Sequence, residues 1–274
     1  MQSFNFEIRF SRGIFWPESY KILFEGIVPG QFVMGDDTNT DVLSVTKPKH
    51  HVLISTPFYM SKFLITQKIW TAVMGKNPSV VKGDDLPVIN VSWRDCVQFC
   101  IELNKILKFA PTYSYEEGTN VVLCNFASEG IRLPTEAEWE YCARGGENYM
   151  YAGSNNLFEV GWFQENANNI MPVGLKKPNK FLLYDMSGNV FEWCHDRFDR
   201  AYYQECGEII SDPQGPTKGF SRIKRGGGWL YKPHASTVYM RGFENENYSS
   251  DTCGFRIVTS SIFCGESLLR SNLL

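Results

Sequence analysis

Apolar stretches preceded by polar capping residues predict three helices in the first half of the chain. Thr66 precedes the first, residues 67–74, and Gly75 follows it, where a left-handed turn can end a helix. Ser92 and Asp95 have the spacing of a capping box at the start of the second. The apolar face of this second helix is formed by Val97, Cys100, Ile101, Leu103 and Leu107.

A further capping box, Thr135 with Glu138, predicts the third helix, which the Arg-Gly-Gly of residues 144–146 ends. Asn104 falls in the middle of the apolar face of the second helix. If its amide is buried there, it should have hydrogen-bond partners.

Runs of β-branched and aromatic residues predict strands. Residues 30–35 predict a strand that runs into a loop, and residues 51–55 and 58–64, separated by Pro57, predict two strands or one bent strand. In roughly the last 125 residues, glycine, asparagine, proline and aromatics dominate, which predicts short strands joined by long structured loops. No repeat or break in composition marks a linker, so we expect a single domain over residues 1–274 with its core at about 25–260.

The composition predicts a stable globular protein without a polyanionic partner. Of the 274 residues, 43% are hydrophobic and 15% aromatic, which is ample for a packed core. The 27 basic and 30 acidic residues give a net charge of -3 and are spread along the sequence, so we expect no nucleic-acid partner.

No apolar run reaches the length of about eighteen residues that a membrane helix needs, and residues 1–10 lack the basic flank and apolar centre of a secretory signal. We therefore expect the chain as given to be soluble, without membrane insertion, and a monomer. Its native location stays open; the cell surface or export is favoured if a signal or lipid anchor preceded Met1.

The eight cysteines include no pair with the CxxC spacing of a zinc or redox site. Cys96 and Cys100 are four positions apart in the second predicted helix, which indicates two buried thiols on one face. We interpret the cysteines as packing residues. Disulfides are the alternative if the protein is exported.

Sequence blocks in a fixed order carry a family resemblance from about residue 25 to 260. The blocks are FVMG (32–35), FLIT (63–66), LPV (86–88), VSWRD (91–95), RLPTEAEWEYCARG (132–145), PVG (172–174), PN (178–179), LYDMSGNVFEW (183–193), RGGGW (225–229) and GFR (254–256). Together they resemble the formylglycine-generating enzyme (FGE), sulfatase-modifying family. The resemblance implies an elaborated C-type-lectin fold of the α+β class, with two to three helices packed on small antiparallel sheets and long irregular loops.

Function does not follow from that fold, which serves enzymes and binding proteins alike. Formylglycine-generating enzymes use two cysteines shortly after an RGGSF-like segment to hold copper and attack the substrate, and the resemblance places these at Tyr231 and Ser236. Neither a phenol nor an aliphatic hydroxyl replaces a thiolate pair, and Cys253 has no partner. No histidine pair, phosphate loop or nucleophile elbow offers another route, so we expect no catalytic residue.

Calcium is the one cofactor that the resemblance suggests. In the family, the turn equivalent to residues 185–192 wraps a calcium ion with two side-chain oxygens and two backbone carbonyls, which here implies Asp185, Gly188, Val190 and Glu192. The alternative is that Glu192 caps the turn or forms a salt bridge within the core, without a metal.

The segment from Arg225 to Val258 opens with RGGGW, closes with GFR, and holds polar and aromatic residues without a strand or helix pattern. This layout resembles the variable proteins of diversity-generating retroelements, whose receptor surface is rewritten by adenine-specific mutagenesis near the 3′ end of the gene. The predicted ligand-contacting residues are Tyr231, Lys232, His234, Ala235, Ser236, Tyr239, Arg241, Phe243, Asn245, Asn247 and Tyr248.

The enclosing residues have a structural role in this interpretation. We expect Trp229 and Phe255 to anchor the core, and Arg225 and Arg256 to donate the hydrogen bonds that hold the scaffold beneath the loops. Tyrosine and asparagine between them suit adaptable recognition, because tyrosine gives a large contact area at low entropic cost.

Some residues of the segment do not fit adenine mutagenesis. Lys232, Met240, Glu244 and Glu246 cannot arise from an AAY codon whose last base is kept, so they would be fixed or have other templates. The expected partner is a protein or a glycan on another cell or host surface, bound over a broad, shallow face. The alternative is an FGE-like domain of fixed specificity, either an accessory surface protein or an oxidase-type enzyme without the usual cysteine pair.

Overall fold

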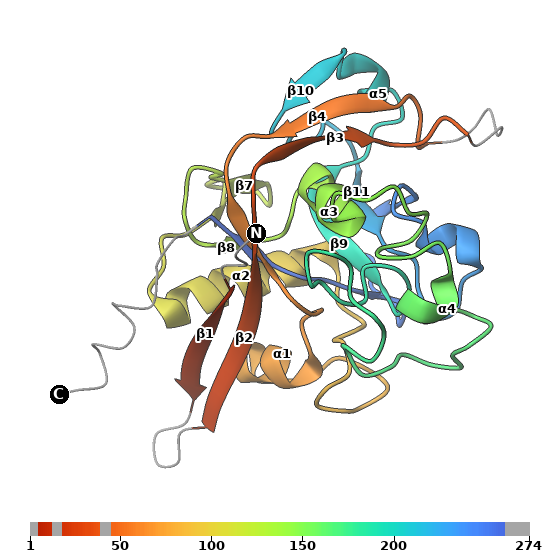
Figure 1. Cartoon of the computed structure of the whole chain (residues 1–274). Coiled ribbons are helices and arrows are strands. Elements are labelled where there is room, and N and C mark those ends of the chain that lie inside the picture. The colour runs from red at the N-terminus through yellow and green to blue at the C-terminus, as the bar shows by residue number, and fades with distance from the viewer. Residues whose placement is uncertain (1–4, 13–17, 39–44, 261–274) are drawn as a thin grey trace.

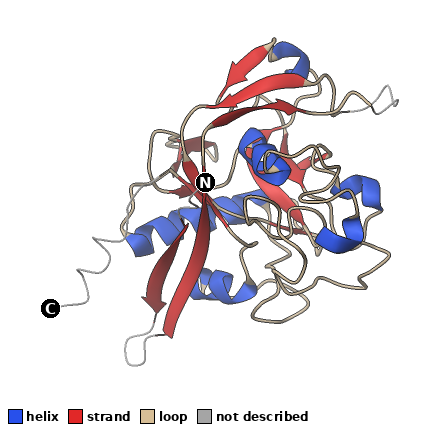
Figure 2. Ribbon diagram, in the orientation of Figure 1, coloured by secondary structure: helices blue, strands red, loops and turns tan. Residues whose placement is uncertain are grey.

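A computed structural model describes residues 5–12, 18–38 and 45–260, and in this part of the chain the strands form four small sheets (Figures 1 and 2). The first is antiparallel with the order β1-β2-β5-β14-β8. Its strands are β1 (Asn5–Arg12), β2 (Glu18–Ile27), β5 (Phe58–Ser61), β14 (Val258–Thr259) and β8 (Ile131–Arg132). The late strand β14 therefore lies between two strands from the first half of the chain.

A four-stranded sheet, ordered β12-β11-β9-β13, carries much of the segment enclosed by RGGGW and GFR. Its strands are β12 (Arg241–Asn245), β11 (Ser221–Arg225), β9 (Phe191–Arg197) and β13 (Cys253–Gly254). Strand β11 pairs antiparallel with both β12 and β9, whereas β13 pairs parallel with β9.

The two remaining sheets are smaller. One has the order β10-β4-β3, with a parallel β10–β4 pair, and the other joins β6 to β7. Their strands are β3 (Gly30–Met34), β4 (His50–Ile54), β10 (Ile209–Ser211), β6 (Tyr113–Tyr115) and β7 (Val122–Cys124). The strands predicted near residues 30–35, 51–55 and 58–64 are thus confirmed as β3, β4 and β5.

The helices include the three that were predicted and three short ones that were not. The predicted helices are α1 (Gln67–Met74), α2 (Trp93–Leu107) and α3 (Glu136–Arg144). The short ones are α4 (Leu157–Val160), α5 (Tyr202–Glu205) and the 3-10 helix η1 (Pro233–Ser236). The predicted α+β class is confirmed.

The predicted helix caps are confirmed, because both capping boxes form. Ser92 accepts from the backbone N–H of Asp95, and Thr135 does the same for Glu138. The buried Asn104 amide donates to Thr112 and to the carbonyl of Ile131, at 3.2 and 3.0 Å. This side chain therefore ties α2 to β8 instead of weakening the core.

The largest core cluster joins the β1–β2 hairpin to α1, α2 and the closing GFR block. Trp70 of α1 stacks on Phe99 of α2 with ring centres 5.4 Å apart, and Phe255 meets both rings edge-on. Phe255 has no exposed surface, as expected of an anchor beneath the loops.

The β1–β2 hairpin was not predicted from the sequence. Ile8, Phe10, Ile22 and Phe24 alternate along its two strands and are buried against the helices. Figure 1 shows the hairpin in red, projecting beside α1. It forms the outer wall of a cavity described below.

The seven described cysteines are free thiols, and six of them are buried. The interpretation of these cysteines as packing residues therefore holds; Cys264 lies outside the described residues. The longest described helix, α2, has 15 residues, and no helix in this part of the chain is long and apolar enough to cross a membrane.

Candidate ligand-binding surface

The opening arginine of the frame, Arg225 at the end of β11, is completely buried and bridges two carboxylates of α3. It forms ion pairs with Glu140 and with Glu136. The same guanidinium donates to the backbone carbonyls of Val238 and Tyr239, at 2.9 and 3.1 Å. Arg225 therefore fixes the path of the loop that returns from η1 to β12.

Arg241 is part of the same buried ion cluster and is not available to a ligand. Its Nε and Nη2 donate to the two oxygens of Glu136, at 2.7 and 2.8 Å, and its guanidinium lies 3.9 Å from the ring centre of Tyr203. The sequence-based assignment of Arg241 to the ligand-contacting surface is therefore corrected. Its partner on α3 is 105 positions away, so no local pattern in the sequence indicates the pair.

The closing arginine, Arg256, is held in the same manner by β9. Its guanidinium binds both oxygens of Glu192, at 2.6 and 2.8 Å, and donates to the carbonyls of Ser61 and Tyr184. Trp139 of α3 donates its indole N–H to the same Glu192 carboxylate at 2.9 Å. The frame is thus a set of buried ion pairs that joins both ends of the segment to the core.

Gly227 in the opening block is required by close packing. It has a φ of +73°, and a Cβ at this position would lie 2.3 Å from the hydroxyl of Ser236 and 2.7 Å from the carbonyl oxygen of Ala235. Ser236 and Ala235 are themselves buried, so both are corrected from ligand contacts to packing residues beneath the opening block.

Trp229 is less buried than an anchor of the main core would be. Its ring is partly exposed and packs against a small separate cluster of Leu64, Ile89, Ile170 and Val190. Its backbone N–H donates to the carbonyl of Asn189 at 2.8 Å, which attaches the opening block to the turn before β9.

Two of the predicted contact residues, Tyr231 and Tyr248, are linked through Phe191 and Lys224 of the four-stranded sheet. Tyr231 packs edge-on against Phe191 with ring centres 5.0 Å apart, and its hydroxyl lies 3.4 Å from that of Thr252. The ammonium of Lys224 lies 5.1 Å from the Phe191 ring centre and 5.6 Å from that of Tyr248. We call these four residues, Tyr231, Phe191, Lys224 and Tyr248, the aromatic patch.

Glu246 anchors the turn that carries Tyr248 of the aromatic patch. It accepts from the Nε atoms of Arg94 on α2 and of Arg222 on β11, at 3.0 and 3.3 Å. Burial alone would raise the pKa of Glu246, but the two arginines outweigh it, and the net pKa is lowered. The residue is therefore a fixed carboxylate, from which Asn247 and Tyr248 continue into solvent.

The other predicted contact residues lie at different places. Lys232 and His234 are exposed around η1, and Asn245 and Asn247 are exposed at and beyond the end of β12. Phe243, 39% exposed, stacks on Phe198 with ring centres 3.8 Å apart. Tyr239 is half-buried and lines a separate cavity of about 820 Å³ with Asp36 and Arg144.

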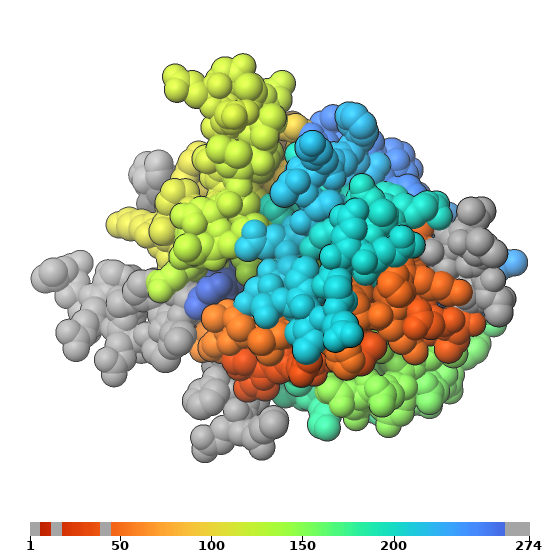
Figure 3. Space-filling model, turned by 90° about the horizontal axis from the view of Figure 1, so that it is seen from above, coloured from red at the N-terminus to blue at the C-terminus, as the bar shows by residue number. Residues whose placement is uncertain are grey.

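Figure 3 shows one face of the molecule, on which the cyan part of the chain that precedes Arg225 lies between the orange region of β3 and β4 and the yellow-green region of β6 and β7, with some of the blue C-terminal part at the edge. Sequence reasoning missed Phe191, Lys224 and Phe198, because all three precede the segment and their contacts with it form only in the folded chain.

The residues at the positions of the enzyme's cysteine pair do not fit copper. Tyr231 offers a phenol, and the Ser236 hydroxyl is buried beneath Gly227. Cys253, in β13, is a free, buried thiol, and burial raises its pKa to about 12. Among the described residues, no group of three histidine, cysteine or acidic side chains is placed to hold a metal.

The four residues implied for calcium do not fit the ion as a set. Both oxygens of Glu192 are engaged by Arg256, and Trp139 shares one of them. Asp185 accepts from the backbone N–H of Gly174 with one oxygen, while its other oxygen is buried without a partner. Burial raises the pKa of Asp185 to about 6. The salt bridge expected for Glu192 without a metal is present, and calcium stays a prediction that a titration would test.

The comparisons with known proteins agree with the sequence resemblance. The family model of the sulfatase-modifying factor enzyme 1-like domain (FGE-sulfatase) matches residues 25–261. The chain is 34% identical over 237 residues to the chaperone protein LppX of Paenibacillus barcinonensis, covering 74% of this chain and 80% of that protein. It is 30% identical over 206 residues to the formylglycine-generating enzyme of Streptomyces coelicolor, covering 68% of this chain but only 57% of the enzyme.

Among solved structures, Treponema denticola variable protein 1 matches with a TM-score of 0.82 and 28% identity, covering 93% of this chain and 99% of that protein. The predicted resemblances to the formylglycine-generating enzyme family and to a variable protein are thereby confirmed.

Proposed function

The chain belongs to the sulfatase-modifying factor enzyme 1-like (FGE-sulfatase) family, and from that premise we propose that it is a non-catalytic ligand-binding protein. It would present the exposed residues between Arg225 and Arg256 on a C-type-lectin scaffold. The proposed partner is a protein or glycan on another cell or host surface.

One observation carries this proposal: within the segment, one group of residues is held in ion pairs with the core, and another group is exposed to solvent. Arg225, Arg241, Glu246 and Arg256 are committed to ion pairs with α2, α3, β9 and β11. The side chains of His234, Asn245, Asn247 and Tyr248 project into solvent. Because the scaffold is held by the first group, the second can change with little effect on folding.

The position of Glu246 supports a diversified surface. Glu246 cannot arise from an AAY codon, and it is one of the residues that ion pairs hold in place. Tyr231, His234, Asn245, Asn247 and Tyr248 are types that adenine mutagenesis of such codons yields, and each is exposed or half-buried. The structural similarity to a variable protein agrees with this assignment.

Fixed specificity is the second candidate function. The similarity to the chaperone protein LppX, 80% of which is covered, and to the formylglycine-generating enzyme supports an accessory surface protein or an oxidase-type enzyme without the usual cysteine pair. The residues at Tyr231 and Ser236 argue against the enzyme's cysteine chemistry, because a copper site of that kind needs thiolates.

Sequencing the DNA around the gene separates the two candidates. A nearby copy of the codons for Trp229 to Cys253 that differs almost only at adenines, beside a reverse-transcriptase gene, is the expected result. The absence of both from the flanking DNA would overturn the diversified surface and favour fixed specificity.

A further inference from the structure

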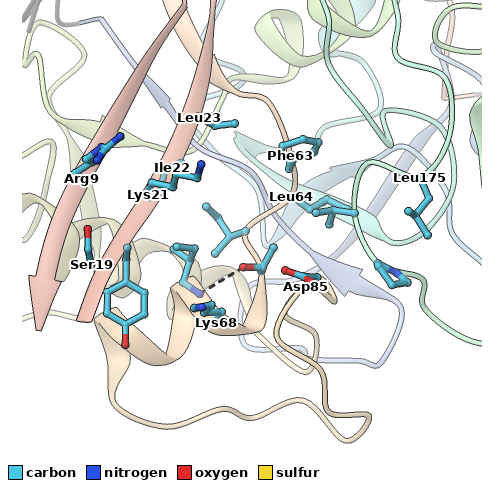
Figure 4. Close-up of a pocket in the computed structure, with 16 residues that line it drawn as sticks. Arg9, Ser19, Lys21, Ile22, Leu23, Phe63, Leu64, Lys68, Asp85 and Leu175 are labelled. Atoms are coloured by element: carbon cyan, nitrogen blue, oxygen red, sulfur yellow. Dashed lines mark hydrogen bonds between the residues drawn. The ribbon is translucent and has the colours of Figure 1, made fainter. Parts of the chain in front are cut away.

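A cavity of about 620 Å³ opens between the β1–β2 hairpin, the β5–α1 connection and residues 172–175 (Figure 4). None of its lining residues belongs to the segment between Arg225 and Arg256, so it is distinct from the ligand-binding surface. Part of its wall, Arg9 and residues 19–23, precedes the segment that the family model matches. The volume lies in the range of small-molecule sites.

The accessible wall of the cavity is mostly apolar. Leu23 of β2, Phe63 and Val173 line it and are half-buried. Leu175 stands opposite the hairpin in Figure 4 and is 59% exposed. An alkyl chain placed here would cover Leu175 and remove apolar surface from water, which stabilises the bound state.

The rim carries an excess of positive charge. Arg9, Lys21 and Lys68 line the cavity, whereas Asp85 is the only acidic residue among the described residues that line it. Arg9 pairs with Glu7. Lys21 and Lys68 are exposed, and neither has an ion-pair partner among the described residues. Two lysines from separate walls therefore remain available to an anion.

We propose that this cavity binds an aliphatic carboxylate of the size of a medium-chain fatty acid. The alkyl chain lies against Leu23, Phe63 and Leu175, and the carboxylate lies at the rim that Lys21 and Lys68 line. The proposal is independent of the ligand-binding role assigned to the C-terminal surface.

The test is a calorimetric titration of the full chain with dodecanoate below its micelle concentration, beside 1-dodecanol as the uncharged ligand of equal length. We expect saturable binding of one dodecanoate per chain, with affinity for the alcohol weaker by about tenfold or more. Equal affinity for the two ligands, or no saturable binding of dodecanoate, would overturn the proposal.

Two pairs of variants locate the site. Lys21→Ala with Lys68→Ala should weaken dodecanoate binding by about tenfold, whereas Lys180→Ala with Lys218→Ala, two exposed lysines outside the cavity, should not change it. Leu175→Asp should abolish binding, whereas Val80→Asp, at an exposed position elsewhere, should preserve it. All six side chains are exposed, so the variants should melt like the parent chain. Binding that survives both cavity variants would place the ligand elsewhere and refute the assignment.

Discussion

Arg256 and Glu192 form a fully buried two-point ion pair, with N–O distances of 2.6 and 2.8 Å. Trp139 donates to the same carboxylate at 2.9 Å. Three sequence blocks, RLPTEAEWE, FEW and GFR, therefore meet at one carboxylate although Arg256 and Glu192 are 64 positions apart. Residues from these three blocks therefore form one buried cluster in the fold.

Breaking this cluster should destabilise the fold strongly. Glu192→Gln leaves the Arg256 guanidinium buried without its counter-charge, and we expect the free energy of unfolding to fall by about 3–5 kcal/mol. The control Glu102→Gln removes the exposed pair with Lys105 and should cost less than about 1 kcal/mol. Urea denaturation measures both; similar losses for the two variants would contradict the assigned role.

The exposed positions should tolerate change together. In a chain carrying His234→Ala, Asn247→Ala and Tyr248→Ala, the free energy of unfolding should stay within about 1.5 kcal/mol of the parent value, because surface substitutions usually cost no more than about 0.5 kcal/mol each. Arg241→Met, which strips Glu136 of a buried partner, should cost about 3 kcal/mol or more. If the triple variant proves as unstable as Arg241→Met, these three residues are structural and the proposed binding surface is wrong.

Gly227 should be far less replaceable than a glycine that only ends a helix. Gly227→Ala would place a Cβ 2.3 Å from the Ser236 hydroxyl at a φ of +73°, so we expect a loss of about 2 kcal/mol or more. Gly75 has a φ of +82° but nothing within 4 Å of its Cβ position, so Gly75→Ala should cost about 1 kcal/mol. Thermal melting of the two variants gives the comparison, and equal losses would show that packing against Ser236 is unimportant.

Local sequence patterns predicted the features that depend on residues close in the chain, such as the helix caps. They did not predict contacts between residues that are far apart in the chain. The caps of α1, α2 and α3 use side chains three positions from the amides they bind, so their spacing was sufficient. Arg241 looked like a surface residue because its partner, Glu136, lies on another element. Phe191 and Lys224 escaped notice because cross-strand neighbours leave no pattern in one sequence.

His195 should make the protein less stable in mild acid. Burial first, and then the charges of Arg222, Arg132 and Arg197, lower the pKa of His195 well below its usual value. Below about pH 6.5 the unfolded chain binds a proton that folded His195 does not, so protonation favours unfolding as the pH falls.

His195→Phe keeps a ring between Tyr113 and Phe126 but removes this proton site. Between about pH 6.5 and 5.5 we expect the parent to lose up to about 1 kcal/mol more than the variant. Urea midpoints at the two pH values measure the loss of stability of each chain. Subtracting the loss of the variant from that of the parent cancels the contribution of every titrating group that the two chains share. Parallel pH profiles would show that folded His195 binds its proton normally.

Calcium should have little effect on the folded protein. The Glu192 carboxylate is already neutralised by Arg256, so a calcium ion could gain it only by displacing a buried guanidinium, which would then lie unpaired. We therefore expect the same melting temperature in EDTA and in millimolar calcium. If calcium does bind, we expect the ion at the free oxygen of Asp185, which is the one side-chain oxygen of the predicted set without a hydrogen-bond partner. A calcium-dependent rise of several degrees that Asp185→Asn abolishes would establish a calcium site and require Glu192 to leave Arg256; a rise that Asp185→Asn leaves intact would place the ion elsewhere on the protein.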